Sequence, residues 1–435
     1  MCKGHAKKWS AENDPQKIMK DTLGVLLAGG AGERLYPLTR DRAKPAVTFG
    51  GNYRIIDITL SNCINSDLRK VYILTQYKAL SLNRHIREGW GSVVARELGE
   101  FIEVLPPMKR VSDSWYLGTA DAVYQNIYSI GSEQSKHVLI LSGDHIYKMN
   151  YQLMMDQHLA AHADVTLATI LISPEECYQF GIVDIDRSGR ITGFEEKPKQ
   201  TKLRSPYNPE MVSGSMGVYI FNTDVLLPVL LKDAEDPNSS HDFGHDILPR
   251  ILDQYKIFSF NFIDENMKEA QYWRDVGTIE AYYEANMDLV SVSPVFNLYD
   301  KHWPIRTHQR QYPPAKFVFG EPGRTGMAID SIVCPGSILS GGYVRNCVLS
   351  PDVRVNSYTE VDTSIIFSHV NIGRHCKVRR AIIDRDVHLP EGTVIGFDPE
   401  EDAKSYIVTE TGITIVTRDY SLFESPVAVD YFTSE

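Results

Sequence analysis

The sequence predicts an α/β domain built on a mostly parallel sheet, followed by a parallel β-helix. Three observations support this fold class. Short apolar, β-rich runs alternate with helical segments up to about residue 285, and a glycine turn directly follows the first of these runs. Beyond about residue 316 the helical period gives way to β-branched residues spaced about six apart. At 435 residues, the chain is long enough for two or three domains.

Composition excludes several classes of protein. Apolar residues make up 43% and charged residues 23%, as is usual for a globular protein with a packed core. The formal net charge of −11 argues against a nucleic-acid partner, which needs a basic face. No apolar run reaches the length of about 20 residues that a membrane span requires, and the polar N-terminus resembles no secretory signal. We therefore expect a cytoplasmic protein without a membrane partner.

The cysteines predict neither a disulfide framework nor a structural zinc site. They are scattered and form no C-x-x-C pair. We expect all six to be reduced: Cys2, Cys63, Cys177, Cys334, Cys347 and Cys376.

Residues 1–20 are expected to be a solvated extension and residues 21–285 to form the sheet domain. Strands are predicted at residues 24–29, 70–77, 137–143, 164–172 and 215–221. A helix is predicted over 119–132, with Thr119 as N-cap, Asp121 in the first turn, and Ala122, Val123, Ile127 and Ile130 on one face. Wholly apolar strands indicate a parallel sheet covered on both faces, with ligands at the carboxyl ends of its strands.

Residues 286–315 are rich in proline and aromatics and are interpreted as a linker that packs. In the expected β-helix, residues 316–420, β-branched positions recur at Ile332, Ile338 and Val344 and again at Ile366, Ile372 and Val378. Turns are supplied by Gly336, Gly341, Gly342, Gly373, Gly392 and Gly396. An ordinary β-sandwich is the alternative for this region, and residues 421–435 are expected to be a tail.

The glycine turn after the first strand predicts a phosphate site. Gly29, Gly30 and Gly32 let backbone N–H groups approach a phosphate chain, and Arg34 and Lys44 follow as cations. The turn lacks the G-K-[ST] of a Walker loop, and Leu35 replaces the last glycine of a dinucleotide fingerprint. A turn with no ligand is the alternative.

Two carboxylates are candidates for a metal site. Asp144 ends the apolar strand "HVLILSGD", and Asp275 lies in "YWRDVGT", outside any amphipathic pattern. Mg²⁺ takes one or two carboxylates together with substrate phosphates. A helix cap is the alternative reading of Asp144.

Two further stretches predict a sugar or nucleotide site. Glu196 and Lys197 in "FEEKP" could accept sugar hydroxyls and meet a phosphate, or could form a solvated surface pair. In "WYLGTADAV", Trp115 and Tyr116 precede Gly118, where a base or sugar could lie against the backbone before a helix. Trp115 could equally belong to the core.

In order along residues 22–396, eleven stretches make the chain resemble the ADP-glucose pyrophosphorylases, and the bacterial enzymes most closely. They are "LAGGAGERL", "RAKPAV", "RIIDITLSNCINS", "TQYK", "WYLGTADAV", "GDHIY", "FEEKP", "SMGVYIF", "SSHDFGHDILP", "YWRDVGT" and "WPIRT". The resemblance implies a Rossmann-like nucleotidyltransferase domain, a C-terminal left-handed β-helix, a homotetramer, and allosteric control by anionic effectors, namely sugar phosphates and AMP. It implies transfer of the adenylyl group of ATP to α-D-glucose 1-phosphate, for glycogen synthesis, with Mg²⁺ as cofactor.

The resemblance also implies roles for individual residues. Arg34, Lys44 and Asp144 are expected to be catalytic, and Asp144 and Asp275 to hold Mg²⁺. The residues expected to bind ATP are Gly29 and Gly30 at the phosphates and Gln76 and Gly118 at the adenine. The expected glucose 1-phosphate pocket consists of Tyr116, Gly181, Glu196, Lys197, Ser215, Tyr219 and Asp242.

Two positions depart from the pattern of the family. Asp41 stands where many bisphosphate-activated relatives carry lysine, so the identity of the activator stays open. Arg42, Arg54 and Arg385 remain as cations for an anionic effector. His245 replaces a usual lysine, which could change the local response to pH.

Three other functions are alternatives to this one. The nearest is a sister sugar-1-phosphate nucleotidyltransferase that uses UTP, dTTP or GTP. A non-catalytic regulatory subunit is disfavoured by the intact Arg34, Lys44 and Asp144. An acyltransferase built on the β-helix would use His369, His375 or His388 as its base, although a fold alone does not establish a function.

Overall fold

The computed structural model describes residues 15–30, 32–107, 115–267 and 271–418. Cys2, most of the expected extension 1–20 and the expected tail 421–435 lie outside the described residues. The described chain divides into two compact units. The first contains residues 15–30, 56–107, 115–267, 271–273 and 299–308, and the second contains residues 32–55, 274–298 and 309–418. The domain boundaries expected from the sequence stay a prediction.

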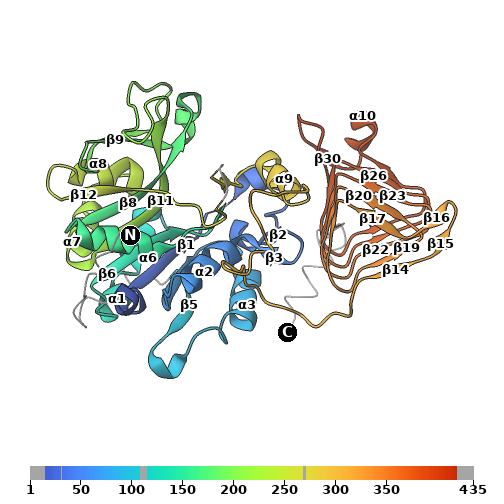
Figure 1. The fold of residues 1–435 in the computed structure, drawn as a ribbon, viewed down its shortest axis with the longest axis horizontal. Coiled ribbons are helices and arrows are strands. Elements are labelled where there is room, and N and C mark those ends of the chain that lie inside the picture. The colour runs from blue at the N-terminus through green and yellow to red at the C-terminus, as the bar shows by residue number, and fades with distance from the viewer. Residues whose placement is uncertain (1–14, 31, 108–114, 268–270, 419–435) are drawn as a thin grey trace, which may run out of the picture. The chain divides into compact units, whose positions relative to one another are not determined.

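The first unit is built on a nine-stranded sheet (Figure 1). Its main path runs β10-β9-β11-β6-β1-β4-β5, and β8 joins β11 to β12. The strands β6, β1, β4 and β5 are parallel, whereas β11 pairs antiparallel with β6, β8 and β9. The predicted parallel sheet is therefore present, with an antiparallel extension on the β11 side.

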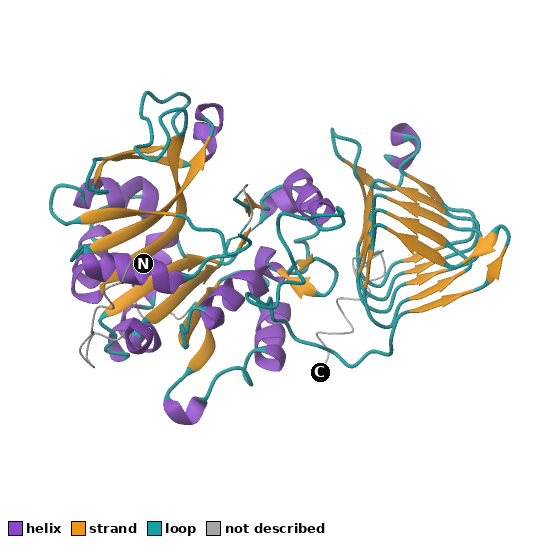
Figure 2. Cartoon of the chain, viewed as in Figure 1, coloured by secondary structure: helices purple, strands orange, loops and turns teal. Residues whose placement is uncertain are grey.

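The strands of this sheet are β1 (Leu23–Ala28), β4 (Lys70–Thr75), β5 (Phe101–Leu105), β6 (His137–Ser142), β8 (Val165–Ile172), β9 (Gly181–Ile185), β10 (Ile191–Glu196), β11 (Val212–Asn222) and β12 (Ile257–Asn261). The helices, purple in Figure 2, are α1 (Pro15–Asp21), α2 (Ile55–Asn65), α3 (Leu80–Gly89), α4 (Thr119–Gln125), α5 (Ile127–Ser132), α6 (Tyr151–Ala160), α7 (Thr223–Ala234) and α8 (Leu248–Ile251). Short 3₁₀ turns span Arg96–Leu98 and Pro174–Gln179, and a π-helical turn, η5, spans Phe243–Ile247. The short strand β7 is His145–Tyr147.

All five predicted strands are present, as β1, β4, β6, β8 and β11. The predicted helix over 119–132 is instead two helices, α4 and α5, that meet at Asn126. The Nδ2 atom of Asn126 donates to the carbonyl of Ala122 at 2.8 Å, and Asn126 has the non-helical angles φ −105° and ψ 12°. A side chain that bonds to nearby backbone competes with the helical ladder, which explains the break.

The predicted N-cap is also wrong by one residue. Gly118 occupies the N-cap position, and Thr119 is already helical. The Thr119 hydroxyl donates to Asp242 rather than accepting from its own helix. Asp121 does lie in the first turn, as predicted.

The second unit combines a segment that follows the glycine turn with a helix and a β-helix. The segment carries 3₁₀ turns at Glu33–Leu35 and Lys44–Ala46 and the hairpin of β2 (Thr48–Phe49) and β3 (Tyr53–Arg54). The helix is α9 (Ile279–Asp288), whose N-cap Thr278 accepts from the N–H of Ala281. Strand β13 (Trp273–Asp275) lies at the boundary between the two units.

The β-helix consists of three sheets whose coils are coloured orange to red in Figure 1, and it is of the predicted left-handed class. Their strands are parallel, except that β30 pairs antiparallel with β31. One sheet contains β14 (Lys316–Val318), β19 (Ile338–Ser340), β22 (Arg354–Val355), β25 (Asn371–Ile372) and β28 (His388–Leu389). The next contains β17 (Met327–Ile329), β20 (Tyr343–Arg345), β23 (Glu360–Asp362), β26 (Lys377–Arg379) and β29 (Val394–Ile395). The third contains β18 (Ile332–Val333), β21 (Val348–Leu349), β24 (Ile365–Ile366), β27 (Ala381–Ile383), β31 (Thr414–Val416) and β30 (Ile407–Val408). A hairpin of β15 (Gly320–Glu321) and β16 (Arg324–Thr325) and the helix α10 (Pro399–Asp402) complete the unit.

Each coil of the β-helix is about one residue shorter than three repeats of six. Arg354 lies beside Asn371, and Asn371 lies beside His388, a step of 17 residues in each case. This shortening explains why the two β-branched triplets do not share one register. Inward-facing side chains such as Val355 and Ile372 are fully buried. The β-sandwich alternative is therefore wrong.

The aromatic segment 286–315 packs, as interpreted from its composition. Phe296 is fully buried in the second unit, with its ring edge-on to Phe49. In the first unit, the Trp303 Nε1 atom donates to Asn62 at 2.8 Å, and the Thr307 hydroxyl donates to Asp57 at 2.6 Å.

The five cysteines within the described residues are free and buried. Burial raises the pKa of Cys347 to about 12, so this thiol stays protonated. Among the helices of the described residues, none combines the length and apolar character that crossing a membrane requires.

Candidate active site

Two candidate residues of the first unit, Gly29 and Gln76, lie at one edge of its sheet. The paired ends of β1 and β4 are Ala28 and Thr75, so Gly29 and Gln76 follow side by side. A Cβ on Gly29 would lie 3.3 Å from the Cβ of Gln76. Strand β6 ends one residue short of Gly143, whose N–H donates to the Leu27 carbonyl at 3.0 Å. This edge is where a parallel sheet binds ligands.

Gly30, unlike Gly29, has free space beside its Cα. A Cβ built on it would meet no atom within 4 Å, so the backbone at Gly30 borders open space. Open space beside a strand-end turn is what a phosphate chain needs in order to reach backbone N–H groups.

Asp144 precedes the short strand β7 and not a helix, so the helix-cap reading of this residue is wrong. Its Oδ1 atom accepts from the Ser142 hydroxyl and lies 3.4 Å from Nε2 of His145. The His145 ring packs against Trp273, with ring centres 4.7 Å apart. Nδ1 of His145 and Nε1 of Trp273 are both buried without a hydrogen-bond partner among the described residues. Buried polar atoms of this kind commonly mark a binding site.

Arg34, Lys44 and Asp275 come together in the second unit. Lys44 is only 7% exposed, and its Nζ donates to Oδ1 of Asp275 at 2.9 Å. Nη2 of Arg34 lies 3.9 Å from the other carboxylate oxygen. Gly32 makes this packing feasible. It takes φ +67°, and a Cβ there would lie 3.1 Å from the Cβ of Lys44.

Glu196 is the centre of the expected sugar pocket. Its Oε2 atom would lie 2.9 Å from a Cβ on Gly181 and equally 2.9 Å from one on Gly244. Asp242 borders the same place, because its Oδ1 would lie 3.4 Å from the Gly244 Cβ. The Glu196 carboxylate, from the end of β10, thus lies over Gly181 of β9 and Gly244 of η5, and the Asp242 carboxylate at the start of η5 borders Gly244.

Tyr219 on β11 lies near Asp242 and Glu196, and Ser215 of the same strand forms a hydrogen bond with it. Burial raises the pKa of Tyr219 well above its usual range, the nearby Asp242 and Glu196 raise it further, and a hydrogen bond with Ser215 opposes them. The Tyr219 ring stacks on Phe243 at 5.5 Å. The phenol therefore stays neutral and able to donate a hydrogen bond.

Tyr116 packs against the core cluster that contains Tyr219. Its hydroxyl accepts from Nδ2 of Asn126 at 3.0 Å, and burial raises its pKa. Nζ of Lys197 lies 3.4 Å from Oε1 of Glu196, and the Lys197 side chain is 61% exposed. Trp115 is not a core residue. It is 52% exposed and stacks on Tyr77 at 4.8 Å.

Gly118 lies against backbone. A Cβ there would stand 2.3 Å from the His241 carbonyl oxygen and 2.5 Å from that of Ser240. The residues around His241 were missed by the sequence reasoning, which singled out only Asp242 and His245 in "SSHDFGHDILP". The left-handed conformation of His241, φ +56°, has no local signal in the sequence.

The three candidate effector cations are engaged to different degrees. Arg42 forms a buried pair with Asp384, with Nη2 at 2.9 Å from both carboxylate oxygens. Arg54 donates to the Ala46 carbonyl, and Arg385 lies 3.7 Å from Asp386. Asp41, the residue that departs from the family pattern, pairs with Arg40 at 3.4 Å. His245 is 64% exposed and lies 3.1 Å from Asp246.

Comparison with known proteins identifies the family. A family model described as nucleotidyl transferase matches residues 23–292, and one described as GlmU-like C-terminal hexapeptide matches residues 313–416. A glucose-1-phosphate adenylyltransferase of Koribacter versatilis is 78% identical over 417 residues, 96% of this chain and 100% of the relative. The chain belongs to the glucose-1-phosphate adenylyltransferase family.

Two more distant adenylyltransferases align over nearly as much of the chain. The one from Rhodopirellula baltica is 52% identical over 96% of this chain and 94% of its own length. The one from Methylococcus capsulatus is 49% identical over 93% of this chain and 95% of its own. The resemblance drawn from the eleven stretches is thus confirmed, and this adenylyltransferase carries its family's two parts, a nucleotidyl transferase sheet and a hexapeptide β-helix.

Proposed function

We propose that the chain transfers the adenylyl group of ATP to α-D-glucose 1-phosphate, giving ADP-glucose and pyrophosphate for glycogen synthesis. The observation that carries this proposal is the position of the Glu196 carboxylate over Gly181 and Gly244, with the Asp242 carboxylate also bordering Gly244, because carboxylates accept hydrogen bonds from sugar hydroxyls. The names of its relatives favour the adenylyl enzyme over a sister that uses UTP, dTTP or GTP.

The chemistry requires little proton transfer. An oxygen of the sugar phosphate forms a bond to the α-phosphorus of ATP, and the bond from that phosphorus to the bridging oxygen of pyrophosphate breaks. A phosphate monoester has a second pKa of about 6, so it is already largely a dianion at neutral pH. The obstacles are repulsion between two anions and the charge that develops on the leaving group, and both are reduced by positioning and positive charge.

Lys44 and Arg34 supply that positive charge in our proposal. Lys44 is held by Asp275 and has little exposure to solvent, so its ammonium is oriented before substrate binds. The side chain of Arg34 is 72% exposed, so we propose that its guanidinium reaches the β- and γ-phosphates. Gly29 and Gly30 would present backbone N–H groups to the same chain, and Gln76 and Gly118 would border the adenine.

Glucose 1-phosphate would be held by groups from both sides of Glu196. Glu196 and Asp242 accept hydrogen bonds from sugar hydroxyls, and the neutral Tyr219 donates one. Lys197 is exposed and next to Glu196, where it meets the monoester phosphate. Tyr116, Gly181 and Ser215 complete the walls.

We propose Mg²⁺ as cofactor, held by Asp144 and Asp275 together with ATP oxygens. The carboxylate oxygens of both residues are the ligands that Mg²⁺ prefers, and the unpartnered Nδ1 of His145 beside Asp144 fits a polar site. When bound, the ion neutralises charge on the phosphates.

Asp144→Asn should lower kcat by at least about 10² with the fold intact, the scale of losing one transition-state contact. Steady-state kinetics and a thermal melt measure both quantities. Asp224→Asn, an exposed acid at the start of α7, is the matched control and should leave kcat unchanged. Near-normal turnover in Asp144→Asn would contradict the metal assignment.

The overall proposal is tested by pyrophosphate release from ATP, UTP, dTTP and GTP with glucose 1-phosphate and Mg²⁺. ATP should give by far the highest kcat/KM. A preference for another nucleotide would identify a sister enzyme, and failure to form any nucleoside-diphosphate glucose would refute the proposal.

We also propose a cytoplasmic homotetramer under the control of anionic effectors, with Arg42, Arg54 and Arg385 as candidate contacts. Adding fructose 1,6-bisphosphate, fructose 6-phosphate, pyruvate or AMP to the same assay identifies the activator and inhibitor. Light scattering measures the assembly. The acyltransferase alternative is disfavoured because the relatives are named as adenylyltransferases.

A further inference from the structure

A four-residue turn, Ser239–Asp242, joins two parts of the candidate site in the first unit. It follows α7 and leads into η5, and it is called turn 239–242 below. His241 within it takes φ +56°, a left-handed conformation that is uncommon for a residue with a side chain. Such a conformation persists only where surrounding contacts hold it.

One side of the turn lies against the start of α4. The His241 carbonyl accepts hydrogen bonds from the N–H groups of Ala120 at 2.8 Å and Asp121 at 3.3 Å. The same oxygen would stand 2.3 Å from a Cβ on Gly118. The position of the His241 carbonyl therefore sets the position of the Gly118 backbone, where we place the adenine.

The other side of the turn sets Asp242, where we place the sugar. Oδ2 of Asp242 accepts from the Thr119 hydroxyl at 2.9 Å. Its Oδ1 accepts from the N–H groups of Gly244 at 2.8 Å and His245 at 3.1 Å. The same turn thus fixes both a backbone wall and a carboxylate.

Asp233, near the end of α7, holds the turn from behind. Its Oδ2 lies 2.8 Å from Nδ1 of His241, and because a carboxylate only accepts, the imidazole donates. Its Oδ1 accepts from the Ser239 hydroxyl at 2.6 Å and from Arg250 at 3.1 Å. Asp233 is only 5% exposed.

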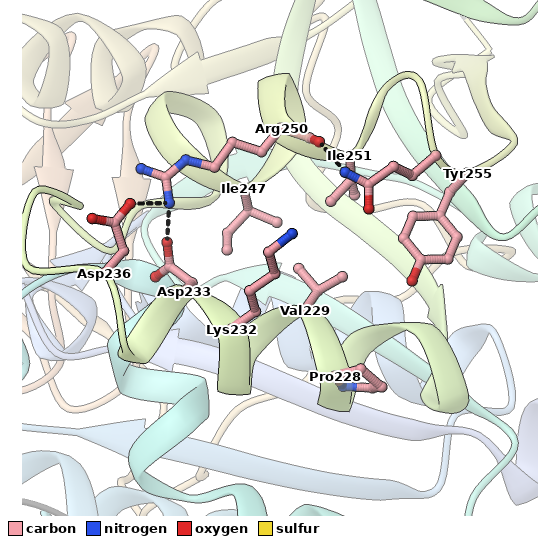
Figure 3. A pocket seen from close by; sticks show the side chains of 10 residues that line it. Pro228, Val229, Lys232, Asp233, Asp236, Ile247, Arg250, Ile251 and Tyr255 are labelled. Atoms are coloured by element: carbon pink, nitrogen blue, oxygen red, sulfur yellow. Dashed lines mark hydrogen bonds and ion pairs between the residues drawn. The ribbon is translucent and has the colours of Figure 1, made fainter.

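Figure 3 shows Arg250 reaching from α8 toward Asp233 and Asp236, along one wall of a pocket between α7 and α8. Asp246 supports the turn as well, because it accepts from the N–H groups of Ser240 at 3.1 Å and Asp242 at 3.2 Å. Burial alone would raise the pKa of Asp246, but the hydrogen bonds from Ser240 and Asp242 outweigh it and lower that pKa to about 2.

We propose that Asp233 and His241 are positioning residues that keep turn 239–242 in the shape that binds both substrates. Neither side chain touches a substrate or the reacting atoms. The inference rests on the proposed function, because it needs the adenine beside Gly118 and the sugar beside Asp242.

The physical consequence is a change in binding with little change in chemistry. Without the hydrogen bond between Asp233 and His241, turn 239–242 samples several conformations. The apparent affinity for each substrate then falls in proportion to the fraction of enzyme whose turn has the substrate-binding conformation. Both substrates are affected, because one turn borders both. Lys44, Arg34 and Asp144 lie on other segments, so a fully bound enzyme still reacts at nearly its normal rate.

Two substitutions at His241 separate the effect of its hydrogen bond to Asp233 from the effect of its backbone conformation. His241→Gly accepts φ +56° without strain but removes the imidazole donor. His241→Asn also tolerates this conformation, and its Nδ2 occupies nearly the place of the imidazole Nδ1, so it restores a donor to Asp233. His162→Gly is the matched control, since His162 is an exposed histidine of the same unit with φ +48°.

We expect His241→Gly to raise KM for both ATP and glucose 1-phosphate by about tenfold while kcat changes less than about twofold. His241→Asn should recover most of the loss, and His162→Gly should match the wild type. Asp233→Asn, which keeps the size of the side chain, should shift both KM values in the same direction as His241→Gly.

Hydrogen exchange gives a readout that does not depend on catalysis. Amides of Ala120 and Asp121 should exchange faster in His241→Gly than in His162→Gly, because their acceptor is less well held. Unchanged KM values in an active His241→Gly enzyme, or a fall in kcat and melting temperature alone, would overturn the inference and leave a purely structural role. A wild-type enzyme that forms no ADP-glucose would overturn the proposed function itself, and this inference with it.

Discussion

Gly118→Ala tests the close approach of two backbone segments in the candidate site. Gly118 has φ −159° and ψ −176°, an extended conformation that alanine also adopts, so the substitution introduces no backbone strain. The effect comes from space alone. The new Cβ would meet the His241 carbonyl oxygen at 2.3 Å and that of Ser240 at 2.5 Å, and both are backbone atoms that cannot rotate away.

The magnitude follows from these distances. Since Cβ contacts below 3.0 Å essentially do not occur, the 240–241 backbone must retreat from Gly118 by at least about 0.7 Å. This retreat lengthens the 2.8 Å hydrogen bond from the Ala120 N–H to the His241 carbonyl nearly to the longest distance of a hydrogen bond. It breaks the 3.3 Å hydrogen bond from the Asp121 N–H to the same carbonyl. Two backbone hydrogen bonds of about 0.5–1.5 kcal/mol each predict a loss of about 1–3 kcal/mol in the free energy of unfolding. A misplacement near 1 Å in an active site costs about 10² in rate, so kcat/KM should fall by that order.

Denaturant unfolding and pyrophosphate-release kinetics measure the two effects. Gly131→Ala is the matched control, because a Cβ at Gly131, within α5, meets nothing within 4 Å. It should raise the free energy of unfolding by about 0.5–1 kcal/mol, as glycine-to-alanine changes in helices do, and leave kcat/KM unchanged. If Gly118→Ala behaves like Gly131→Ala, the close approach does not constrain the site, and the reasoning is wrong.

Three further outcomes are expected. Lys197→Ala should raise KM for glucose 1-phosphate with kcat nearly unchanged, since we propose that its exposed ammonium binds the monoester phosphate in the ground state; a loss in kcat alone in steady-state assays would contradict that role. Arg42→Met should lower the free energy of unfolding by about 3–5 kcal/mol in denaturant melts, because the Asp384 carboxylate stays buried without its partner. The double variant Arg42→Met, Asp384→Asn should recover part of that loss. Burial, together with the nearby His158 and Lys136, lowers the pKa of His137 to about 4. The unfolded chain therefore binds the extra proton first, and stability should fall by up to about 3 kcal/mol as pH drops from 6.5 to 4, a slope that His137→Gln should flatten in melts across that range.

The sequence was sufficient to predict the elements whose signal is local. Each predicted strand is a mostly apolar run, because a strand buried on both faces has apolar residues at most positions. The helix over 119–132 was predicted as one element because its apolar spacing continues past Asn126. Nothing in that spacing reveals that the Asn126 side chain bonds back to the Ala122 carbonyl.

The corners of the β-helix are likewise only partly predictable from the sequence. Glycine was used as the turn signal, and Gly336, Gly341 and Gly392 do take positive φ. Most corners carry other residues in the same conformation. One corner series reads Asn346, Thr363 and Arg380, another Asp352, His369 and Asp386, and a third Tyr358 and His375, all with positive φ. The stacked coils impose this geometry, so residue type at a corner is only a weak guide.

For the site, sequence reasoning selected the groups that we propose contact substrate but not the groups that hold them in position. Arg34, Lys44 and Asp275 are distant in sequence, and only the folded second unit brings Lys44 to Asp275. Their types were nevertheless sufficient to select them, because phosphate chemistry requires cations and carboxylates. Asp233 has no such signature and resembles any acid near the end of a helix.

The chemistry of the reaction explains why the sequence indicates the proposed substrate-contacting groups but not the residues that position them. A transfer between two phosphates needs no activated nucleophile, so its rate depends on how well two anions are positioned among fixed charges. The residues that fix position need only fill space, bond to backbone or hold a turn, and many residue types serve. Gly118 is recognisable because only glycine fits 2.3 Å from a carbonyl oxygen, whereas Asp233 and His241 become recognisable only through the contacts they make. In an enzyme of this kind, the contacts behind the substrate pocket should therefore influence KM as strongly as the groups that line it.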